Sequence, residues 1–452
     1  MHKHWLITAR LSAVAFVATA SPALASPLSD EEARALREEV ARLRTRVEDL
    51  ERRLVEPAAP PPAAAPVAAA GPRIEWKGSP RIVEGDRAFK VKGRIQADLN
   101  SVSNPGGRPD KGLGVSNEFR RIRLGGEGDL GSSFGYKLEL ELSDNSVDLV
   151  DTFVTYRKGP WLLTLGNHNQ FQSLDELIGD TGGSVMERAA FTDAFNFERR
   201  LGVSAQYKRG ALLAQAGVFT DDVGALANDS DGPEGGDEND SFSLDGRVVY
   251  APKLGPTQLH FGASAHWRKR NRLAAAPVDY RQRPFAHSSN SRLIGVRDLP
   301  VDREFSHGLE FGMVNGRWHA AAETHWLRPH RLDGPSPRFW GGYAELGYYL
   351  TDDSRPYDNG IFATAKPKTP LGKGGFGALQ LNLRYDMLDL DSRGLRGGTQ
   401  DGYIAALVWT PIQFLRFNLN YAYLDYSGAL ALPDGRTDYG VHVFGSRFEL
   451  DF

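Results

Sequence analysis

Arginine side chains gather in two segments of this chain, and their chemistry suits the binding of anions. Arg120, Arg121 and Arg123 lie within one short stretch, and Arg94 lies in an earlier stretch. A guanidinium group stays charged at any physiological pH and binds phosphate or carboxylate through paired hydrogen bonds. In the wall of a channel such groups form stepping sites for anions. The alternative is a set of internal salt bridges, and the sequence favours the two interpretations about equally.

Acidic side chains dominate another segment, residues 169–199, in which the only basic side chains are Arg188 and Arg199. Its carboxylates belong to Asp175, Glu176, Asp180, Glu187, Asp193 and Glu198. If the segment folds into a narrow lumen, these charges act in a confined space of low dielectric constant and help to decide which ions pass. The alternative is a surface loop whose charges are solvated.

The sequence lacks the patterns that mark enzymes and metal centres. It contains no Walker loop, no HExxH motif and no GxSxG motif. The chain has no cysteine, which excludes thiolate metal sites and a cysteine nucleophile. The net charge of -3 gives no signal for nucleic acid binding. We therefore expect no catalytic activity, no metal and no cofactor, and a hydrolase carried on a barrel is the least favoured alternative.

The elements that position these charges are expected to be β-strands, because side chains alternate with a period of two from about residue 88. In residues 438–452 an apolar face that ends in Phe452 alternates with a charged face that carries Arg447, Glu449 and Asp451. Successive side chains of a strand point to opposite faces. A charged lumen behind an apolar, lipid-facing exterior is typical of an outer-membrane barrel. One such segment taken alone also fits an ordinary half-buried edge strand.

The alternation predicts sixteen strands, joined in turn by short turns and long loops. That asymmetry is typical of a barrel whose two rims face the periplasm and the cell exterior. The link 351–375 is an exception, because the strand count places this long segment on the short-turn rim. The predicted spans are 88–99, 117–129, 134–143, 149–157, 161–168, 200–209, 211–220, 241–250, 257–267, 305–314, 317–327, 338–350, 376–390, 400–410, 413–426 and 438–452.

The first 87 residues divide into three parts. Residues 1–25 combine basic residues, a short apolar stretch and small residues before Ala25, which predicts a signal peptide cleaved after that residue. Residues 26–55 predict a helix, and residues 56–87, which begin with proline and alanine, predict an extended linker. Because no later run of about 18 apolar residues could form a spanning helix, the exported chain is expected in the periplasm, the outer membrane or the medium.

The predicted helix 26–55 begins with a capping box formed by Ser29 and Glu32. Its apolar residues follow spacings of four and three, the seam of a coiled coil. They are Leu36, Val40, Leu43, Val47, Leu50 and Leu54. Valine at one seam position and leucine at the other favours two strands, so a trimer would need tethering from elsewhere in the chain. The alternative is a lone solvated helix.

Two other long links carry charge of opposite sign. Residues 268–303 are rich in arginine and could attract anions or hold the phosphates of lipopolysaccharide. Residues 221–240 are acidic and contain no basic residue; they could bind divalent cations, although a solvated chain without fixed structure is favoured.

Several short segments follow one another in a fixed order between Phe89 and Phe452. They are Gly93-Arg94-Ile95-Gln96-Ala97-Asp98, Phe119-Arg120-Arg121-Ile122-Arg123-Leu124-Gly125, Met186-Glu187-Arg188, Gly341-Gly342-Tyr343, Leu350-Thr351-Asp352-Asp353, Arg355-Pro356-Tyr357, Lys366-Pro367, Gly377-Ala378 and Leu383-Arg384-Tyr385. Each motif is short, but their order across sixteen predicted strands resembles the phosphate-selective porin O and P family.

This resemblance implies a trimer of sixteen-stranded barrels, each with an inward third loop and an arginine-lined pore that conducts anions. It matches four arginines of this chain to arginines of phosphate-selective members, with Arg188 nearest the constriction. The other three are Arg94, Arg120 and Arg121.

The chain also departs from the family pattern in the third loop. Glu176 stands where phosphate-selective members carry a lysine that helps to hold phosphate. Gly179 and Asp180 stand where those members carry serines. Because a carboxylate in place of a cation reverses the local field, phosphate selectivity does not follow from the resemblance.

We therefore expect an all-β protein, with a 16-stranded antiparallel transmembrane barrel over residues 88–452. It is expected in the outer membrane of a Gram-negative bacterium, with the coiled coil in the periplasm. The predicted function is passive diffusion of small charged solutes, chiefly anions such as phosphate or polyphosphate, through a lumen narrowed by residues 169–199. Expected partners are further copies of the chain in a trimer, outer-membrane lipids and lipopolysaccharide, the barrel assembly machinery through Phe452, and peptidoglycan. The main alternative is a general or weakly selective porin that also tethers the envelope.

Overall fold

The computed structural model describes residues 29–55, 71–108, 110–143, 145–221, 223, 241–270 and 277–452. The predicted signal peptide, residues 56–70 of the predicted linker and nearly all of the acidic stretch 221–240 lie outside these ranges. The chain divides into two units, residues 1–69 and residues 70–452, which are described separately. Among the described residues, no helix is long and apolar enough to cross a membrane.

The first unit contains one helix, α1 (Asp30–Val55), whose N-terminus has the predicted capping box. The backbone N–H of Ser29 donates to the Glu32 carboxylate at 3.0 Å, and the backbone N–H of Glu32 donates to the Ser29 hydroxyl at 3.3 Å. The seam residues of this helix are exposed, as Leu36 is at 60% and Leu43 at 55%. An apolar row left uncovered on a single helix is consistent with a coiled coil, and that assembly remains a prediction.

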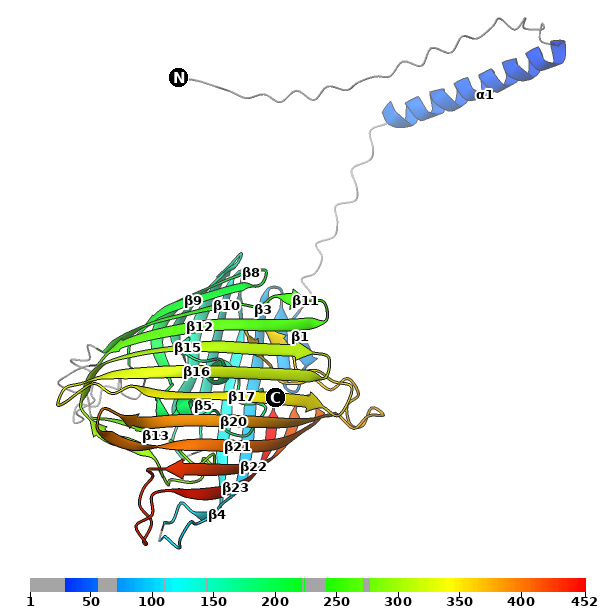
Figure 1. Ribbon diagram of the computed structural model, residues 1–452. Helices are drawn as coiled ribbons and strands as arrows, with labels where there is room; N and C mark the ends of the chain where they lie inside the picture. Colours follow the sequence, from blue (N-terminus) through cyan, green and yellow to red (C-terminus); the bar gives the residue numbers. More distant parts are fainter. Residues whose placement is uncertain are drawn as a thin grey trace, which may run out of the picture. The chain divides into compact units, whose positions relative to one another are not determined.

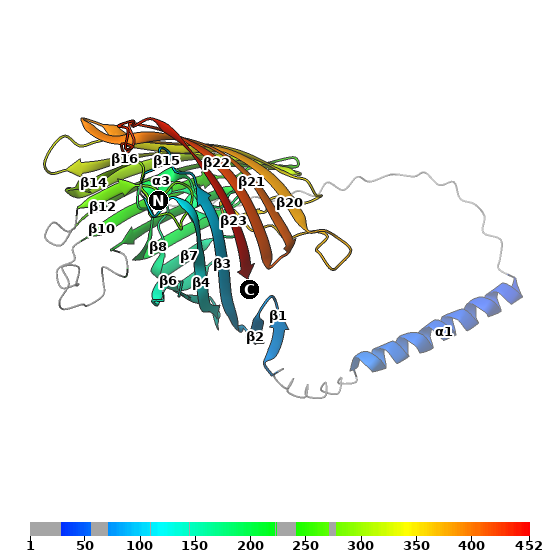
Figure 2. The same cartoon turned by 90° about the horizontal axis from the view of Figure 1, so that it is seen from below.

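The second unit is a closed barrel of sixteen antiparallel strands, as predicted (Figures 1 and 2). The last strand pairs with the first barrel strand, and Phe452 and Gly93 exchange backbone hydrogen bonds of 2.9 and 3.0 Å at this junction. The strands are β3 (Arg87–Val102), β4 (Gly114–Gly131), β5 (Phe134–Glu141), β6 (Asp148–Lys158), β7 (Trp161–Asn169), β8 (Arg199–Arg209), β9 (Leu212–Phe219), β10 (Phe242–Tyr250), β12 (Thr257–Lys269), β15 (Val301–Asn315), β16 (Trp318–Arg331), β17 (Phe339–Tyr349), β20 (Ala378–Ser392), β21 (Leu395–Ile412), β22 (Leu415–Ser427) and β23 (Tyr439–Asp451).

Two short elements extend this sheet beyond the predicted strands. Within the stretch predicted as linker, β1 (Arg73–Trp76) and β2 (Pro80–Glu84) form a hairpin that pairs with the start of β3. The two-residue β11 (Lys253–Leu254) pairs with the start of β12. The sequence from Arg73 to Glu84 has left the proline–alanine composition of the linker, so the ordered unit begins earlier than its predicted boundary at residue 88.

The two faces of the barrel wall divide as the alternation predicts. In β23, Phe444 and Phe448 are exposed on the outside, whereas Arg447 and Glu449 are buried on the inside. Aromatic side chains pair across strands at the short-turn rim, as between Trp161 and Tyr207, whose ring centroids lie 4.9 Å apart. An apolar exterior with aromatic side chains near its rims suits a wall that faces lipid.

Three links fold into the barrel. Residues 170–198 contain α2 (Leu174–Leu177) and α3 (Ala190–Ala194), and residues 277–300 contain the hairpin β13 (Val278–Arg281) and β14 (Gly295–Leu299). The third is part of the long link 351–375, which contains β18 (Tyr357–Asp358) and β19 (Ile361–Phe362). The unexpected length of this link at the short-turn rim therefore has a structural explanation, since it too fills the lumen.

The inward links bring an apolar core into the barrel. Phe191 of α3, Tyr280 of β13 and Phe362 of β19 are almost fully buried in one cluster, which also includes Leu388 and Leu424 of the wall. One side of the interior is thus packed like the core of a soluble protein, whereas strand alternation predicts a charged lumen. The basic link 268–303 also enters the barrel, because its residues 277–300 lie inside.

Close strand contacts give a test of the barrel wall. A methyl group added to Gly128 in β4 would lie 2.0 Å from the carbonyl oxygen of Ala88, whereas the nearest atom to one added to Gly246 in β10 is 3.9 Å away. We expect Gly128→Ala to destabilise the barrel by about 2 kcal/mol, because the backbone of β3 must move. Gly246→Ala is the matched control.

Both variants are folded in detergent, heated in steps and run on a gel on which the folded barrel migrates differently from the unfolded chain. The midpoint temperature of unfolding is then compared with that of the parent protein. A lower midpoint for Gly128→Ala with an unchanged midpoint for Gly246→Ala is the expected pattern. Equal midpoints for the two variants would contradict this account of the β3–β4 contact.

Candidate functional site

A bulge in β4 brings two consecutive arginines to the lumen. Gln96 of β3 pairs with Arg121, but its neighbour Ala97 pairs with Phe119, so Arg120 is the extra residue. Phe119 remains on the outside and is 58% exposed. Strict alternation would have placed Arg120 on the lipid side, and the bulge lets both arginines line the central cavity.

The central cavity has a volume of about 390 Å³ and is bounded by the third loop, the β4 wall and the inward segment 282–287. All of the carboxylates predicted for the constriction line it, as do Arg120, Arg121 and Arg188. Its lining includes seven arginines and six carboxylates, so the formal charges nearly balance. The arginines are Arg120, Arg121, Arg188, Arg199, Arg283, Arg384 and Arg447, and the carboxylates are Asp175, Glu176, Asp180, Glu187, Asp193 and Glu198.

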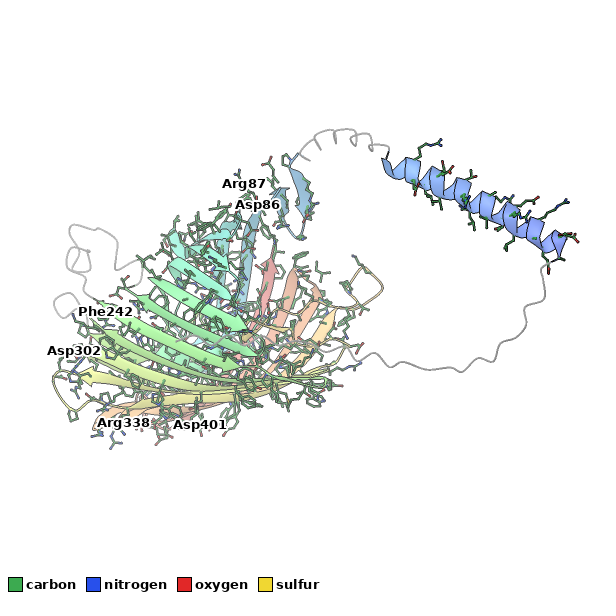
Figure 3. The ribbon with its side chains drawn as sticks, turned by 90° about the horizontal axis from the view of Figure 1, so that it is seen from above. Asp86, Arg87, Phe242, Asp302, Arg338 and Asp401 are labelled. Atoms are coloured by element: carbon green, nitrogen blue, oxygen red, sulfur yellow. The ribbon has the colours of Figure 1, made fainter. Side chains whose placement is uncertain are left out.

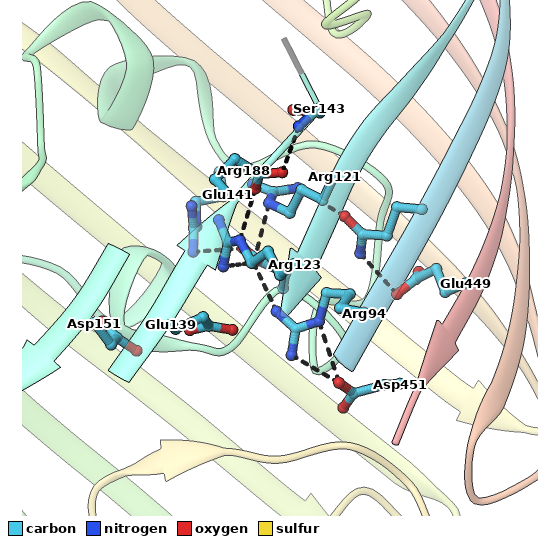
Figure 4. Close-up of polar contacts among 12 residues, drawn as sticks. Arg94, Arg121, Arg123, Glu139, Glu141, Ser143, Asp151, Arg188, Glu449 and Asp451 are labelled. Carbon is cyan, nitrogen blue, oxygen red and sulfur yellow. Dashed lines mark hydrogen bonds and ion pairs between the residues drawn. The ribbon is translucent and has the colours of Figure 1, made fainter. Parts of the chain in front are cut away.

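Four arginines converge on the carboxylate of Asp180. Figure 4 shows these arginines, Arg94, Arg121, Arg123 and Arg188, gathered in one place. Its Oδ2 atom lies 2.9 Å from Arg94 Nη1, 3.1 Å from Arg121 Nε and 3.0 Å from Arg123 Nη1, and its Oδ1 atom lies 3.3 Å from Arg188 Nη2. The Asp180 side chain is only 7% exposed. The structure thus brings together Arg94, Arg121, Arg123 and Arg188 as one group around a single negative charge.

A second layer of polar groups holds these arginines in place. Arg123 Nε lies 2.7 Å from Glu141 Oε2, and Arg94 Nη2 lies 3.2 Å from Asp451 Oδ1. Arg121 donates to the side-chain oxygen of Gln96 at 2.8 Å. These partners come from β3, β5 and β23, so the cluster straddles the seam at which the barrel closes.

Arg188 is bound, not free. Its Nε lies 3.4 Å from Glu176 Oε2, and its guanidinium group also donates to the backbone carbonyl oxygens of Asp175, Glu176 and Ile178 at 3.1 to 3.3 Å. Together with its contact to Asp180, these bonds make Arg188 a brace inside the third loop. The loop backbone therefore fixes the position of the Arg188 guanidinium group relative to the cavity.

The other predicted carboxylates have separate partners. Glu187 pairs with Arg447 of β23, which also holds Asp98, and in the described part of the chain Glu187 forms no ion pair with Arg188. Asp175 Oδ1 lies 3.1 Å from Arg384 Nη2, and its Oδ2 accepts a hydrogen bond from the backbone N–H of Ala189 at 2.7 Å. Asp175 therefore anchors the loop to β20, whereas Asp180 and Glu176 belong to the arginine group.

The third-loop carboxylates differ in how firmly they hold their charge. Burial alone would raise the pKa of Asp180, but the four surrounding arginines hold that pKa well below its usual range. Burial opposes ionisation of Glu187 as well, yet Arg447 and Arg120 lower its pKa to about 2. In Glu176, burial outweighs the attraction of Arg188 and raises the pKa. As pH falls, Glu176 is therefore the first of these three groups to lose its charge.

Arg120 has no partner of its own. Within the part of the chain that the structure describes, its guanidinium group makes no hydrogen bond or ion pair, and its Nε atom is buried without an acceptor. Neighbouring arginines of the same strand are all paired. Arg120 is thus the arginine of β4 whose donors remain available to the cavity.

Sequence reasoning did not predict that Arg355 of the link 351–375, Arg416 of β22 and Arg447 of β23 hold the third loop. They donate to backbone carbonyl oxygens of the loop, as Arg355 does to Gly182 at 3.1 Å, Arg416 to Thr181 at 2.8 Å and Arg447 to Met186 at 2.6 Å. The inward positions of Arg416 in β22 and Arg447 in β23 follow from the alternation of those strands. Their partners could not be known before the loop was placed.

Comparison with known proteins matches this architecture. A model of the phosphate-selective porin O and P family matches residues 89–452. An uncharacterized protein of Caulobacter vibrioides is 58% identical over 475 aligned residues, which cover 99% of this chain and 96% of the relative.

Two solved structures have the same fold at very low sequence identity. The anion-selective porin from Comamonas acidovorans has a TM-score of 0.51 and 12% identity, with 81% of this chain and 100% of that chain covered. The outer-membrane expressed OmpT of Vibrio cholerae has a TM-score of 0.52 and 9% identity, with 82% and 100% covered. Since the family model covers most of the chain and the barrel is complete, this chain belongs to the phosphate-selective porin O and P family and is an outer-membrane porin.

Proposed function

We propose that this porin is a passive channel for small solutes with a weak preference for anions. The observation that carries the proposal is the convergence of four arginines on the single carboxylate of Asp180 at the wall of the cavity. Arg120 adds a fifth guanidinium group whose donors face the cavity without a partner. Anions that enter the cavity meet an excess of positive charge along β4.

The preference is proposed to be weak because carboxylates stand close to the same arginines. Glu141 and Asp451 neutralise part of the charge on Arg123 and Arg94, and Glu176 does so for Arg188. Such balance suits a general anion pathway better than a site that retains one solute. Phosphate and polyphosphate are candidate solutes by family membership, and Glu176 argues against tight phosphate binding.

We further propose that the protein is a homo-oligomer and that α1 stands in the periplasm. The exposed seam of α1 needs a second copy to bury it. OmpT of Vibrio cholerae, which shares the fold, has been solved in a trimer form. A role of α1 in tethering the envelope, for example to peptidoglycan, is compatible with a channel function and does not replace it.

Removal of the central carboxylate tests the anion pathway. We expect Asp180→Asn to raise the chloride-to-potassium permeability ratio about three- to tenfold, because the four arginines around Asp180, two of which line the cavity, then have one counter-charge fewer. Glu176→Gln is expected to shift the ratio in the same direction by less. The measurement is the reversal potential of single channels in a planar bilayer under a salt gradient.

Asp333→Asn is the matched control, since Asp333 pairs with Arg331 on an exposed loop outside the cavity. It removes the same formal charge and is expected to leave the reversal potential unchanged. A shift towards cations in Asp180→Asn, or a shift of equal size in the control, would contradict the proposed pathway.

A cysteine scan tests association through α1, because the chain has no cysteine of its own. We expect Leu43→Cys, at a seam position, to form a disulfide-linked dimer under mild oxidation, since seam residues of paired helices face each other. Thr45→Cys, on the outer face of the helix, is the control and is expected to stay monomeric on a non-reducing gel. Equal cross-linking at the two positions would show that α1 does not pair through this seam.

A further inference from the structure

The outer face of the barrel carries a basic patch at its long-loop rim. Arg328 near the end of β16 and Arg338 just before β17 are both exposed, and their inward neighbours Leu327 and Phe339 are buried. The pairing of β16 with β17 runs up to Leu327 and Phe339, so Arg328 and Arg338 occupy the next positions on the two strands. Figure 3 places Arg338 at this rim, far from Asp86 and Arg87 at the opposite rim.

The two guanidinium groups face the same surface without a counter-charge. Within the described residues, neither makes a hydrogen bond or an ion pair through its side chain. Like charges at opposing positions of neighbouring strands repel each other. A pair of this kind is stabilised only when an anion lies between or above the two groups, or when water screens them.

The basic patch continues on β15. Arg303 is half exposed, and its Nε lies 3.6 Å from Asp302 Oδ1, a long contact that leaves most of its donors available. Lys269 of β12 lies opposite Arg303 in the register. Towards β20 the outer face becomes acidic, with Asp389 opposite Trp340, so the patch is confined to the outer surface of β12 to β17.

Aromatic side chains lie next to these charges on the outer face, on the side nearer to the middle of the membrane. Phe305 lies beside Arg328 in the register, and Trp267 lies beside Phe305. One step further into the membrane, Trp326 pairs with Trp340 and stacks on His307, with ring centroids 5.2 Å apart. Tryptophan and tyrosine mark the level at which lipid headgroups meet acyl chains, so the arginines stand at headgroup level.

From this arrangement we propose a binding site for the phosphorylated lipid anchor of lipopolysaccharide on the outer face of β15 to β17. Arg328 and Arg338 hold the phosphates, Arg303 supports them, and the acyl chains lie along Phe305 and Trp326. The long-loop rim faces the cell exterior in a porin, which is the leaflet where this phosphorylated glycolipid is found. Guanidinium groups in pairs suit phosphate better than a neutral headgroup. The proposal rests on the family's place in the outer membrane and not on the selectivity of the pore.

The test measures binding of purified lipid A to the full-length protein in detergent by native mass spectrometry. For the variant with Arg328→Ala and Arg338→Ala, we expect the Kd for lipid A with two phosphates to rise about tenfold or more. The Kd for lipid A from which both phosphates have been removed is expected to stay the same. Arg209→Ala, an exposed arginine at the opposite rim, is the control and is expected to change neither value.

An unchanged Kd for the phosphorylated lipid in the double variant would overturn the proposal. So would an equal loss of affinity for the dephosphorylated lipid, because the contact would then be with the acyl chains alone. Heat-modifiable migration of the double variant establishes that its barrel is folded. Single-channel conductance of the same variant is expected to match the parent protein, so failure of the lipid site and failure of the channel proposal are told apart.

Discussion

The interior of this barrel depends on the rule that a buried charge must have a partner. Asp180 and the arginines around it satisfy that rule together, because three of the arginines come from the wall and one from the third loop. Leaving any of these charges alone in a poorly hydrated lumen would cost roughly 3 to 5 kcal/mol. The contact that places the third loop is therefore the same contact that sets the field at the constriction, and neither can change without the other.

The wall repeats this arrangement at other points of the loop. Arginines of β22 and β23 and Arg355 of the link 351–375 bind loop carbonyl oxygens, while carboxylates bind loop amides, as Glu323 does to the backbone N–H groups of Leu174 and Asp175 at 3.1 Å. A segment whose only regular elements are two short helices thereby has backbone groups paired with the wall inside the barrel. These bonds fix the position of the loop against the wall, so the width of the lumen depends on them.

The sequence predicts the wall well and the interior poorly, and the two outcomes have one cause. Strand alternation is local, so the sixteen strands and the inward position of Arg447 could be predicted from residue types alone. The bulge at Arg120 breaks the alternation without any change in composition, so it could not be foreseen. Residues 277–300 include Tyr280 and Ile294, whose exposure to water in a surface loop would be unfavourable. These side chains could have indicated that the segment folds into the barrel. The partners of Arg384 and Arg416 depend on contacts between distant segments, and one sequence gives no register for those.

The same residue type behaves differently on the two faces of the wall, and the dielectric environment explains the difference. Inside, Arg94, Arg121 and Arg123 each have a carboxylate within 3.2 Å, because no bulk water is there to solvate them. Outside, Arg328 and Arg338 remain without a partner among the described residues. At headgroup level, water, ions and lipid phosphates supply the hydrogen-bond acceptors and the counter-charge that the chain does not supply. Paired arginines hold the fold, whereas arginines left without a protein partner are free to bind something else. By that criterion Arg120 in the lumen and Arg328 at the rim have donors left for anions from the surroundings, whereas the group around Asp180 sets the field that anions in the lumen meet.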